Sequence, residues 1–477
     1  MQQPITRRQF LVTSAALTGS VALSGGVWEL LDRFHLGSAA SSKVRLVTAS
    51  NETFIPSVCL LCPSGCGIVA RVADGRVVKL EGNPMHPINT GALCPKGQAA
   101  LELLYNPDRL SGPMHRVGER GSGKWESVTW AEAIQTVAAR LNETRDNGHP
   151  ERTAFLYGET RGQMRSFIER FMRAVGSPNT ISHDSLNIEA TRLAMYLTQG
   201  IYDVPAYDLE NANYILSFGA SFLEGGRVPQ RMISGYAFMR RGRPDRGKIV
   251  VFDPRQGVTG AKADEWIPIK LGTDVALALG IANVIIASGQ FDEDFVHNYA
   301  YGFEDFLDGD EQLHVGFKSF VLKNYTPEMV EAITGVPSTT ISRIAGEFIG
   351  NNPSVAILPG KGGLLNGSVN GLYAAMAIHM LNALAGSIEK PGGIMTQRYM
   401  PFPEWSPLPA DPIAEQGCQA ERVDGAGTVF PVARHAYQAV PDRILDGYPL
   451  DNLLLYDANP IYEAPIGSRF LQAFDQI

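Results

Sequence analysis

The sequence has little of several features that define other classes of protein. Only five cysteines occur in 477 residues, which excludes a scaffold built on disulfides. Basic residues are not in surplus: 41 Lys and Arg stand against 49 Asp and Glu, and the formal net charge is −8. A strong nucleic-acid binder usually carries the opposite balance, so no nucleic-acid partner is expected. Past the amino terminus there is no long uncharged apolar run, so no transmembrane segment is predicted there.

What remains is the composition of a globular protein with many loops. Hydrophobic residues make up 44% of the chain and charged residues 19%, which is too apolar for disorder. At roughly 100 to 200 residues per domain, the length allows two to four domains. Gly (49) and Pro (30) together make up about 17% of the residues, above the usual level of about 12%. A loop-rich α/β protein that holds a large ligand fits this excess.

The amino terminus has the pattern of an export signal. Residues Thr6 to Leu11 contain two adjacent arginines, and an uncharged stretch rich in Ala, Ser, Thr and Gly runs from Val12 to Trp28. A membrane-spanning helix needs about 20 predominantly apolar residues, and this stretch is too polar for one. A twin-arginine signal with its linker is therefore predicted over residues 1–45, with Ser38 to Ala40 as a candidate cleavage region. This route exports folded proteins, so it suits a chain that receives a cofactor first.

Four of the five cysteines are clustered. They read Cys59-x2-Cys62-x3-Cys66, then 27 residues, then Cys94 followed by Pro-Lys-Gly. A [4Fe–4S] cluster needs four thiolates, of which three on one loop can hold one side and a distant fourth can close the other. Between them, Asp74-Gly75 joins two β-rich runs in a strong hairpin pattern, which can bring Cys94 back.

Other arrangements of these cysteines fit less well. Zinc usually takes C-x2-C pairs or Cys/His sets. An exported chain permits disulfides, but Cys59 and Cys62 are too close to need one. Tandem two-cluster ferredoxins have x2, x2, x3 spacing, which differs from this one. Cys418 has no sequence neighbour that could pair with it and, in the loop-like stretch Ala414 to Gly425, is not expected to be a ligand.

The rest of the chain alternates helical and β patterns. A capping box at Thr129 to Glu132 predicts a helix to about Arg145, and an amphipathic helix is expected from about Arg161 to Val175. Further helices are predicted over Asp274 to Ala287 and Leu372 to Ala385. The predicted strands are short apolar runs: Thr153 to Tyr157, Tyr214 to Phe218, Ile249 to Phe252, Val355 to Leu358 and Leu453 to Tyr456. This alternation favours an α/β fold of doubly wound, mainly parallel sheets, with Pro401 to Pro412 as an irregular connection.

Four of these strands are followed by turns whose residues suit a phosphate-bearing ligand: Tyr214 to Phe218, Ile249 to Phe252, Val355 to Leu358 and Leu453 to Tyr456. Glycines let backbone N–H groups approach phosphate oxygens, and an acidic residue at a strand end can accept hydrogen bonds from a ribose or purine. Each turn alone is also typical of an ordinary α/β connection. None of them is a G-x-G-x-x-G or Walker A sequence, so simple NAD or ATP binding is not indicated.

Taken together, the signal, the cysteine spacing and the segment Lys248 to Gly280 resemble the molybdopterin-dependent oxidoreductases of the dimethyl sulfoxide reductase family. Within it, the sequence is most similar to the polysulfide, thiosulfate and tetrathionate reductase branch and related quinone-linked complexes. The resemblance implies one [4Fe–4S] cluster and a molybdenum or tungsten ion held by two molybdopterin guanine dinucleotides.

The resemblance also assigns residues. Lys96 matches the basic residue between cluster and pterin in the electron path, although a lysine there could merely offset the cluster's charge. The cluster ligands are Cys59, Cys62, Cys66 and Cys94. The cofactor-binding segments contain Ser221, Asp253, Arg255, Gly272, Thr273 and Asp274 for one dinucleotide, and Gly360, Lys361, Gly362, Asn370 and Asn459 for the other pterin.

This sequence departs from the family at the metal-ligand place. The sulfur-compound branch has a Cys a few residues after a Ser-His pair, and here Asn187 stands there. A neutral amide is a weaker metal donor than a thiolate; Asp184 or Ser185 would serve if the register were shifted. His183 is expected to be a hydrogen-bonding or core histidine rather than a ligand.

Length is the second departure, because family members usually continue into a C-terminal β-barrel-like domain, which is expected to be missing here. The expected domains are a [4Fe–4S] module at 50–112, a pterin-binding domain from 113–158 and 350–477, and a dinucleotide-binding domain at 159–349.

The leading functional hypothesis is a periplasmic respiratory oxidoreductase acting on a small inorganic sulfur or other oxyanion substrate. By resemblance, its partners are a ferredoxin-like iron–sulfur subunit and a membrane quinone-interacting subunit, through which it would associate with the membrane. The alternative is a non-catalytic iron–sulfur electron-relay or scaffold subunit of a quinone-linked membrane complex that has lost molybdenum.

Overall fold

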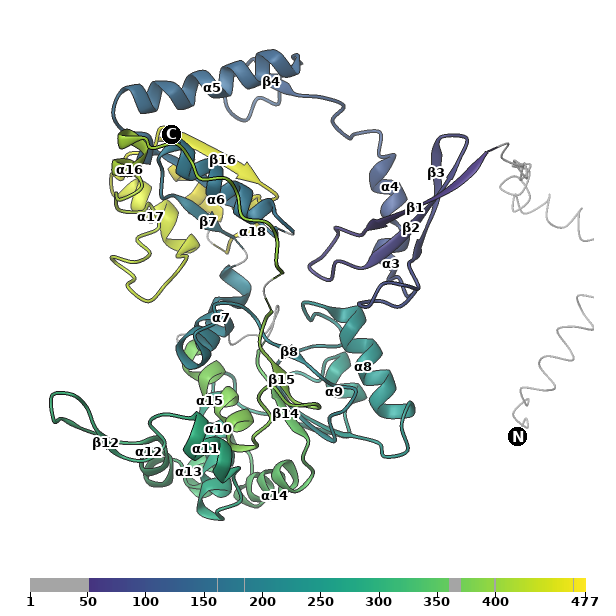
Figure 1. Cartoon of the computed structure of the whole chain (residues 1–477), viewed down its shortest axis with the longest axis vertical. Helices are drawn as coiled ribbons and strands as arrows, with labels where there is room; N and C mark the ends of the chain where they lie inside the picture. Colours follow the sequence, from purple (N-terminus) through teal and green to yellow (C-terminus); the bar gives the residue numbers. More distant parts are fainter. Residues whose placement is uncertain (1–50, 161, 184, 360–369, 399, 466) are drawn as a thin grey trace, which may run out of the picture. The chain divides into compact units, whose positions relative to one another are not determined.

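The computed structural model describes residues 51–160, 162–183, 185–359, 370–398, 400–465 and 467–477 (Figure 1). The predicted twin-arginine signal lies outside these residues. Among the residues described, no helix is both long and apolar enough to cross a membrane.

The amino-terminal module is a three-stranded sheet followed by two short helices. Its strands are β1 (Glu52–Val58), β2 (Gly67–Ala73) and β3 (Arg76–Gly82), in the order β1-β2-β3. Asp74 and Gly75 have φ angles of 47° and 79°, the left-handed pair that a two-residue hairpin turn requires. The predicted hairpin is therefore confirmed. The two helices are α3 (Pro95–Gln98) and α4 (Ala100–Leu104).

A short hairpin and a capped helix come next. Strands β4 (Met114–Arg116) and β5 (Trp125–Ser127) pair antiparallel. Helix α5 (Trp130–Asp146) begins with the predicted capping box: the backbone N–H of Glu132 donates to the Thr129 hydroxyl, and the N–H of Thr129 donates to the Glu132 carboxylate. Two orphan N–H groups of the first turn are thus satisfied.

One parallel sheet has the order β16-β6-β7, formed by β6 (Thr153–Tyr157), β7 (Thr180–Ser182) and β16 (Asn452–Tyr456). Helix α6 (Met164–Val175) connects β6 to β7. A buried cluster that includes Leu156, Ile181, Tyr437 and Phe470 forms its core. The carboxyl-terminal part of the chain adds the helices α16 (Pro412–Gly417), α17 (Val440–Leu445), α18 (Pro460–Glu463) and α19 (Gly467–Phe474).

The second parallel sheet has the order β11-β10-β9-β14. Its strands are β9 (Tyr214–Phe218), β10 (Lys248–Phe252), β11 (Glu265–Ile267) and β14 (Ser354–Ile357). Every residue of β9 and β14 is buried, which means that both faces of the sheet are covered.

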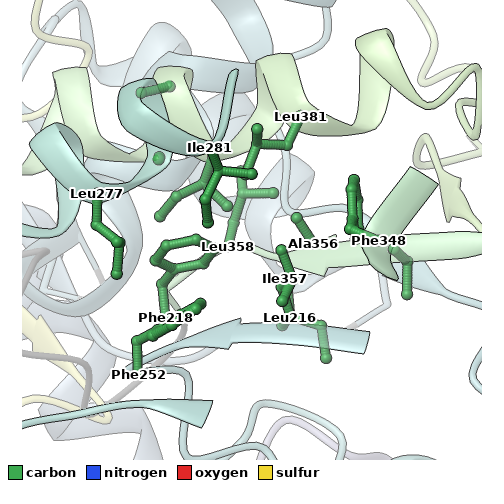
Figure 2. Packing of buried hydrophobic residues seen from close by; sticks show 14 of the residues in the cluster. Leu216, Phe218, Phe252, Leu277, Ile281, Phe348, Ala356, Ile357, Leu358 and Leu381 are labelled. Carbon is green, nitrogen blue, oxygen red and sulfur yellow. The ribbon is translucent and has the colours of Figure 1, made fainter. Parts of the chain in front are cut away.

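A single large core lies against this sheet. Phe218 and Phe252 have ring centroids 4.9 Å apart, and Figure 2 shows them packed with Ile281 of α10 (Asp274–Ala287) and Leu381 of α15 (Gly371–Leu384). Helix α10 is apolar around most of its circumference, as a fully buried helix must be. The other helices of this region are α7 (Ser185–Gln199), α8 (Pro229–Arg241), α9 (Val258–Lys262), α11 (Glu293–Tyr299), α12 (Phe317–Asn324), α13 (Pro327–Thr334) and α14 (Ser338–Gly350).

Two further pairs of short strands are antiparallel: β8 (Ala206–Tyr207) pairs with β15 (Ile394–Met395), and β12 (Phe306–Leu307) pairs with β13 (Leu313–His314). Residues 401–411 carry no helix or strand, as expected. Cys418, however, caps the helix α16, so the stretch Ala414 to Gly425 is not wholly loop-like.

The predicted α/β class and parallel strands are confirmed, and each expected strand lies within one residue of its observed bounds. Helix α6 begins at Met164 rather than near Arg161, and Gly162, with φ +58°, has a conformation that a helix cannot include.

The sheets divide the chain differently from the expected domains. Strand β14, expected with 113–158, is hydrogen-bonded to β9, and β7, expected within 159–349, pairs with β6. Short apolar parallel strands look alike in sequence, so the local pattern does not reveal which sheet each one joins.

Candidate functional site

The cysteine loop is held together by backbone and side-chain hydrogen bonds. Cys59 follows β1, and its N–H donates to the carbonyl of Cys66 at 2.8 Å, which closes the loop that also carries Cys62. Cys94 is brought back by Asn89, a fully buried residue. The Asn89 amide accepts from Gly67 N–H at 2.9 Å and donates to the carbonyls of Gly67 at 3.0 Å and Ala92 at 2.6 Å.

None of the four cysteines is in a disulfide, and Cys62, Cys59 and Cys94 all lie near enough to Cys66 to affect its pKa. Burial raises the pKa of the Cys66 thiol; a hydrogen bond with the Ser64 hydroxyl (3.5 Å) lowers it, and the neighbouring thiols of Cys62, Cys59 and Cys94 raise it. Among the described residues no three His, Cys, Asp or Glu side chains converge on a single metal ion. A [4Fe–4S] cube does not require such convergence, because each thiolate binds a different iron. The residues present fit that group.

Lys96 is exposed in α3, two residues beyond Cys94. Its expected role in the electron path stays a prediction. Asn89 was missed by sequence reasoning, because a buried amide within a turn-rich stretch looks like any surface turn residue.

A second group of predicted residues meets at the carboxyl edge of the four-stranded sheet. The turn after β9 contains Gly219 and Ser221, both with left-handed φ angles of 58° and 45°. The N–H of Gly219 donates to the carbonyl of Phe252, the last residue of β10, at 2.9 Å. The turn after β10 starts with Asp253, whose carboxylate accepts from the N–H of Arg255 at 2.8 Å. These two turns are thus fixed side by side.

The loop before α10 joins them. Gly272 has φ +77°, the Thr273 hydroxyl donates to the carbonyl of Lys270 at 2.7 Å, and Asp274 is buried in the first turn of the helix. Burial and, to a lesser extent, the charge of Asp253 together raise the pKa of Asp274 to about 6. The two carboxylates therefore lie near each other at a helix amino terminus, with accepting oxygens for a purine or ribose and left-handed turns for close phosphate approach. These residues fit a dinucleotide.

The strand order places a ligand crevice beside this group. From β9 the chain proceeds to β10 and β11 on one side and returns to β14 on the other, so the order reverses between β9 and β14. Ligands of open α/β sheets bind beyond the carboxyl ends at such a point. Helix α7 is tied there, since the Thr191 hydroxyl donates to the carbonyl of Pro359 at 2.6 Å.

The residues expected at the other pterin are only partly described. Gly360, Lys361 and Gly362 lie outside the described residues. Asn370 is the exposed residue before α15, and Asn459 is the exposed residue before α18, following β16 of the three-stranded sheet. The structure does not bring these two asparagines into one described contact.

The metal-ligand place lies where β7 passes into α7. Asn187 is in the first turn of α7; its side chain and those of Asp184 and Ser185 lie outside the description. The N–H of His183 donates to the carbonyl of Tyr157 at 2.7 Å. Its ring packs edge-on against Tyr437 at 4.9 Å, and its Nε2 lies 3.7 Å from the Glu463 carboxylate.

Sequence reasoning missed a polar cluster next to this turn. The Glu189 carboxylate of α7 accepts from the Tyr202 hydroxyl at 2.6 Å and from the backbone N–H groups of Arg434 and His435. Burial raises the pKa of Glu189, and it also raises that of Tyr202. The only sequence signal was the pair of charged residues in α7, Glu189 and Arg192, which a surface helix would share.

His435 of this cluster is neutral. Burial, and next the charge of Arg422, lowers its pKa to about 3. Its Nδ1 lies 3.5 Å from both the N–H of Ser182 and the Arg422 guanidinium, so Nδ1 is an acceptor and Nε2 carries the hydrogen.

Comparison with known proteins decides the family. Residues 109–424 match the family described as molybdopterin oxidoreductase, and residues 52–106 match its Fe4S4 domain. The first match covers more than half of the chain. The chain belongs to the molybdopterin oxidoreductase family. Its domains are accordingly those that hold a molybdenum–pterin cofactor and a [4Fe–4S] cluster, as the resemblance implied.

Several members of the family are similar over much of this chain. The arsenate respiratory reductase molybdopterin-containing subunit of Shewanella sp. (strain ANA-3) is 30% identical, over 100% of this chain and 58% of its own. The thiosulfate reductase molybdopterin-containing subunit of Salmonella typhimurium is 30% identical, over 83% and 48%. The menaquinone reductase, molybdopterin-binding-like subunit of Nitratidesulfovibrio vulgaris is 26% identical, over 98% and 61%.

Among solved structures, acetylene hydratase from Pelobacter acetylenicus matches with a TM-score of 0.60 and 26% identity, over 71% of this chain and 44% of that one. The chain thus spans about half to three-fifths of the length of these family members.

Proposed function

We propose that this chain is part of a periplasmic respiratory oxidoreductase that acts on a small inorganic oxyanion. A [4Fe–4S] cluster would relay electrons to or from a bis(molybdopterin guanine dinucleotide) site, and a twin-arginine signal would direct export. The observation that carries the proposal is the gathering of four free thiols by Asn89 in a chain whose sheet edge also gathers Asp253 and Asp274. The named activities of the arsenate and thiosulfate reductases support an inorganic substrate.

The residues of this chain would do separate parts of the work. Cys59, Cys62, Cys66 and Cys94 would hold the cluster. Asp253 and Asp274 would accept hydrogen bonds from a guanine or ribose, and the turn containing Ser221 would let phosphate oxygens approach backbone N–H groups. When bound, the metal would supply two-electron transfer of an oxygen or sulfur atom.

The protein's polar cluster would act on the substrate's charge. Neutral His435 presents an Nε2 hydrogen bond donor, and the Arg192 guanidinium lies over the Tyr202 ring at 5.9 Å. Fixed donors of this kind stabilise negative charge on oxygen without reorganising. Partner subunits would be a ferredoxin-like iron–sulfur protein and a membrane quinone-interacting protein.

A second candidate is an iron–sulfur relay subunit without molybdenum. Two observations favour it: Asn187 stands at the family's metal-ligand place, and the menaquinone reductase relative is named as a molybdopterin-binding-like subunit. Such a subunit would keep the four cysteines and lose the reaction at molybdenum.

Quantitative metal analysis of the purified full-length chain tests both. We expect about four irons per chain, and about one molybdenum or tungsten per chain supports the oxidoreductase. Iron without molybdenum or tungsten supports the relay, and zinc without iron contradicts both. Reduction of arsenate or thiosulfate by a reduced viologen dye then tests the substrate class.

A further inference from the structure

Helix α9, which follows the turn after β10, is fixed to the four-stranded sheet by Trp266 of β11. A Cβ atom at Gly260 of α9 would lie 3.1 Å from Cδ1 of the indole, so the helix backbone packs directly on the ring. The indole N–H also donates to the carbonyl of Asp253 at 3.0 Å. The turn after β10 and helix α9 therefore form one unit with the sheet.

The turn after β9 is joined to this unit by Glu224. The Glu224 carboxylate accepts from the backbone N–H of Thr259 at 3.0 Å and also from the Thr259 hydroxyl. The oxygen of that hydroxyl accepts in turn from the N–H of Leu223 at 3.1 Å. Thr259 lies in the first turn of α9 and is buried. Three hydrogen bonds thus connect the two turns, and the buried Thr259 side chain takes part in two of them.

Gly257, the residue before α9, leaves room for the Glu224 carboxylate. A Cβ atom at Gly257 would lie 2.5 Å from Oε1 of Glu224, which is closer than two such atoms approach. Any residue with a side chain would therefore displace the carboxylate. The same Cβ position lies 3.8 Å from Nη2 of Arg255. The carboxylate of one turn and the guanidinium of the other both lie beside this glycine.

Glu224 is also tied to Ser221, the residue of this turn with an unusual backbone conformation. Ser221 has a left-handed φ angle of 45°, which is uncommon for a residue with a side chain. Its carbonyl accepts from the N–H of Glu224 at 3.2 Å. The main chain of Glu224 thus contacts Ser221, while its side chain contacts Thr259. The hydrogen bond of Gly219 joins the same two turns next to the strands, and Glu224 joins them further along the turn.

We propose that Glu224 is a positioning residue for the dinucleotide, and that it acts through Thr259. It holds the turn containing Ser221 in place beside the turn containing Asp253. The proposal rests on the function proposed above and adds the residue that prepares the site. A turn that is ordered in advance does not have to be ordered on binding, so less of the binding free energy is lost. Because the contact needs acceptor oxygens and no charge, a neutral amide would serve at this position.

Binding of GDP to the purified full-length chain without its pterin cofactor tests the proposal. GDP carries the guanosine and both phosphates of the dinucleotide, and its binding, measured by titration calorimetry, needs no turnover. Glu224→Ala should weaken GDP binding by about tenfold, because the turn must then be ordered on binding. Glu224→Gln keeps an oxygen that accepts both hydrogen bonds and should bind GDP as the unmodified chain does. The control Glu210→Ala removes a carboxylate that pairs with Arg231 ahead of β9 and should leave the GDP affinity unaltered.

A double variant shows whether Glu224 acts through Thr259. Thr259→Val removes the hydroxyl that takes part in two of the three hydrogen bonds, so it should also weaken GDP binding. The double variant should bind GDP no more weakly than Glu224→Ala alone, because both substitutions break the same link. Additive losses would mean that Glu224 contacts the nucleotide itself, and they would overturn the positioning role.

Denaturant unfolding of the same proteins separates a role in binding from a role in folding alone. Lower stability of Glu224→Ala with unaltered GDP affinity would overturn the proposal and leave the dinucleotide site standing. Absence of GDP binding by the unmodified chain would contradict that site, and the role of Glu224 with it. Should Thr259→Val fail to fold, the comparison of Glu224→Ala with Glu224→Gln, at an exposed position, decides: equal GDP affinity in these two variants overturns the proposal.

Discussion

The side-chain amide of Asn382 makes both hydrogen bonds that a neighbouring strand would make to Ala356. Its Oδ1 accepts from the Ala356 N–H at 2.8 Å, and its Nδ2 donates to the Ala356 carbonyl at 2.9 Å. Ala356 lies in β14, whose other edge pairs with β9. The Tyr207 hydroxyl accepts the next N–H on that edge, from Leu358, at 3.0 Å. An edge of the buried sheet is thereby closed by side chains.

Replacing the Asn382 amide should lower the free energy of unfolding. Asn382→Leu leaves a buried N–H and a buried carbonyl without partners, and we expect about 3 kcal/mol lower free energy of unfolding. Denaturant unfolding of the purified protein measures it. Asn324→Leu makes the same substitution at an exposed position of α12 and should change stability by no more than about 0.5 kcal/mol; a similar loss in both variants would contradict the edge-closing role.

Removal of the distant cysteine should abolish the cluster. Cys94→Ala takes away one of four thiolates, so we expect loss of the reduced-state paramagnetic signal of a [4Fe–4S] cluster and a clear fall in bound iron. Cys418→Ala is the matched control, because the Cys418 thiol points to the carbonyl of Arg173 at 3.9 Å and not to the other cysteines. Equal iron in the two variants would show that Cys94 is not a ligand.

The Asn89 amide, which brings Cys94 back, should also be needed to retain the iron. Asn89→Leu removes the hydrogen bonds to Gly67 and Ala92 while leaving all four thiols in place. We expect several-fold faster loss of iron to a chelator than in the unmodified protein. Asn106→Leu, at an exposed position, serves as the control and should release iron at the unmodified rate. Unchanged release from Asn89→Leu would mean that the cysteine loop holds its form without the amide.

The raised pKa of Asp274 predicts a stability that depends on pH in the cofactor-free protein. A carboxyl whose pKa rises from 3.8 to about 6 on folding holds its proton more tightly in the folded state. Its ionisation therefore costs folding free energy as pH rises from about 4 to 6, by about 3 kcal/mol in full. Asp274→Asn should be more stable than the unmodified chain at pH 7 and lose that advantage below about pH 4. Denaturant unfolding at both pH values measures the difference, and a constant difference would contradict the burial of Asp274 as the cause.

Much of the fold followed from local patterns. Each strand of the two parallel sheets is a short apolar run that ends at a polar or glycine-rich turn, and such runs are recognisable without neighbours. The capping box is likewise local, because its hydrogen bonds join Thr129 and Glu132. The turn at Asp74-Gly75 is local because it connects two strands that are consecutive in sequence.

Pairing between distant segments could not be predicted in the same way. Nothing in Val355 to Leu358 indicates that this strand lies beside β9 rather than β6. Asn382 and Asn89 are polar residues whose partners are backbone groups of other segments, so their burial has no sequence pattern. At the candidate site, the spacing of the cysteines was specific enough to predict an iron–sulfur cluster. The polar cluster around Glu189 and His435 could not be predicted, because its residues come from segments far apart in the chain.

The neutrality of His435 has a consequence for how an enzyme of this kind would respond to acidity. With a pKa near 3, and with Arg422, Asp424, Arg165 and Arg192 as the charges around it, the imidazole keeps one protonation state from mildly acidic to alkaline solution. A bell-shaped rate profile in that interval would then have to originate in other groups or in the successive ionisations of the oxyanion itself. Any pH dependence of the rate in that interval would therefore not come from the His435 imidazole.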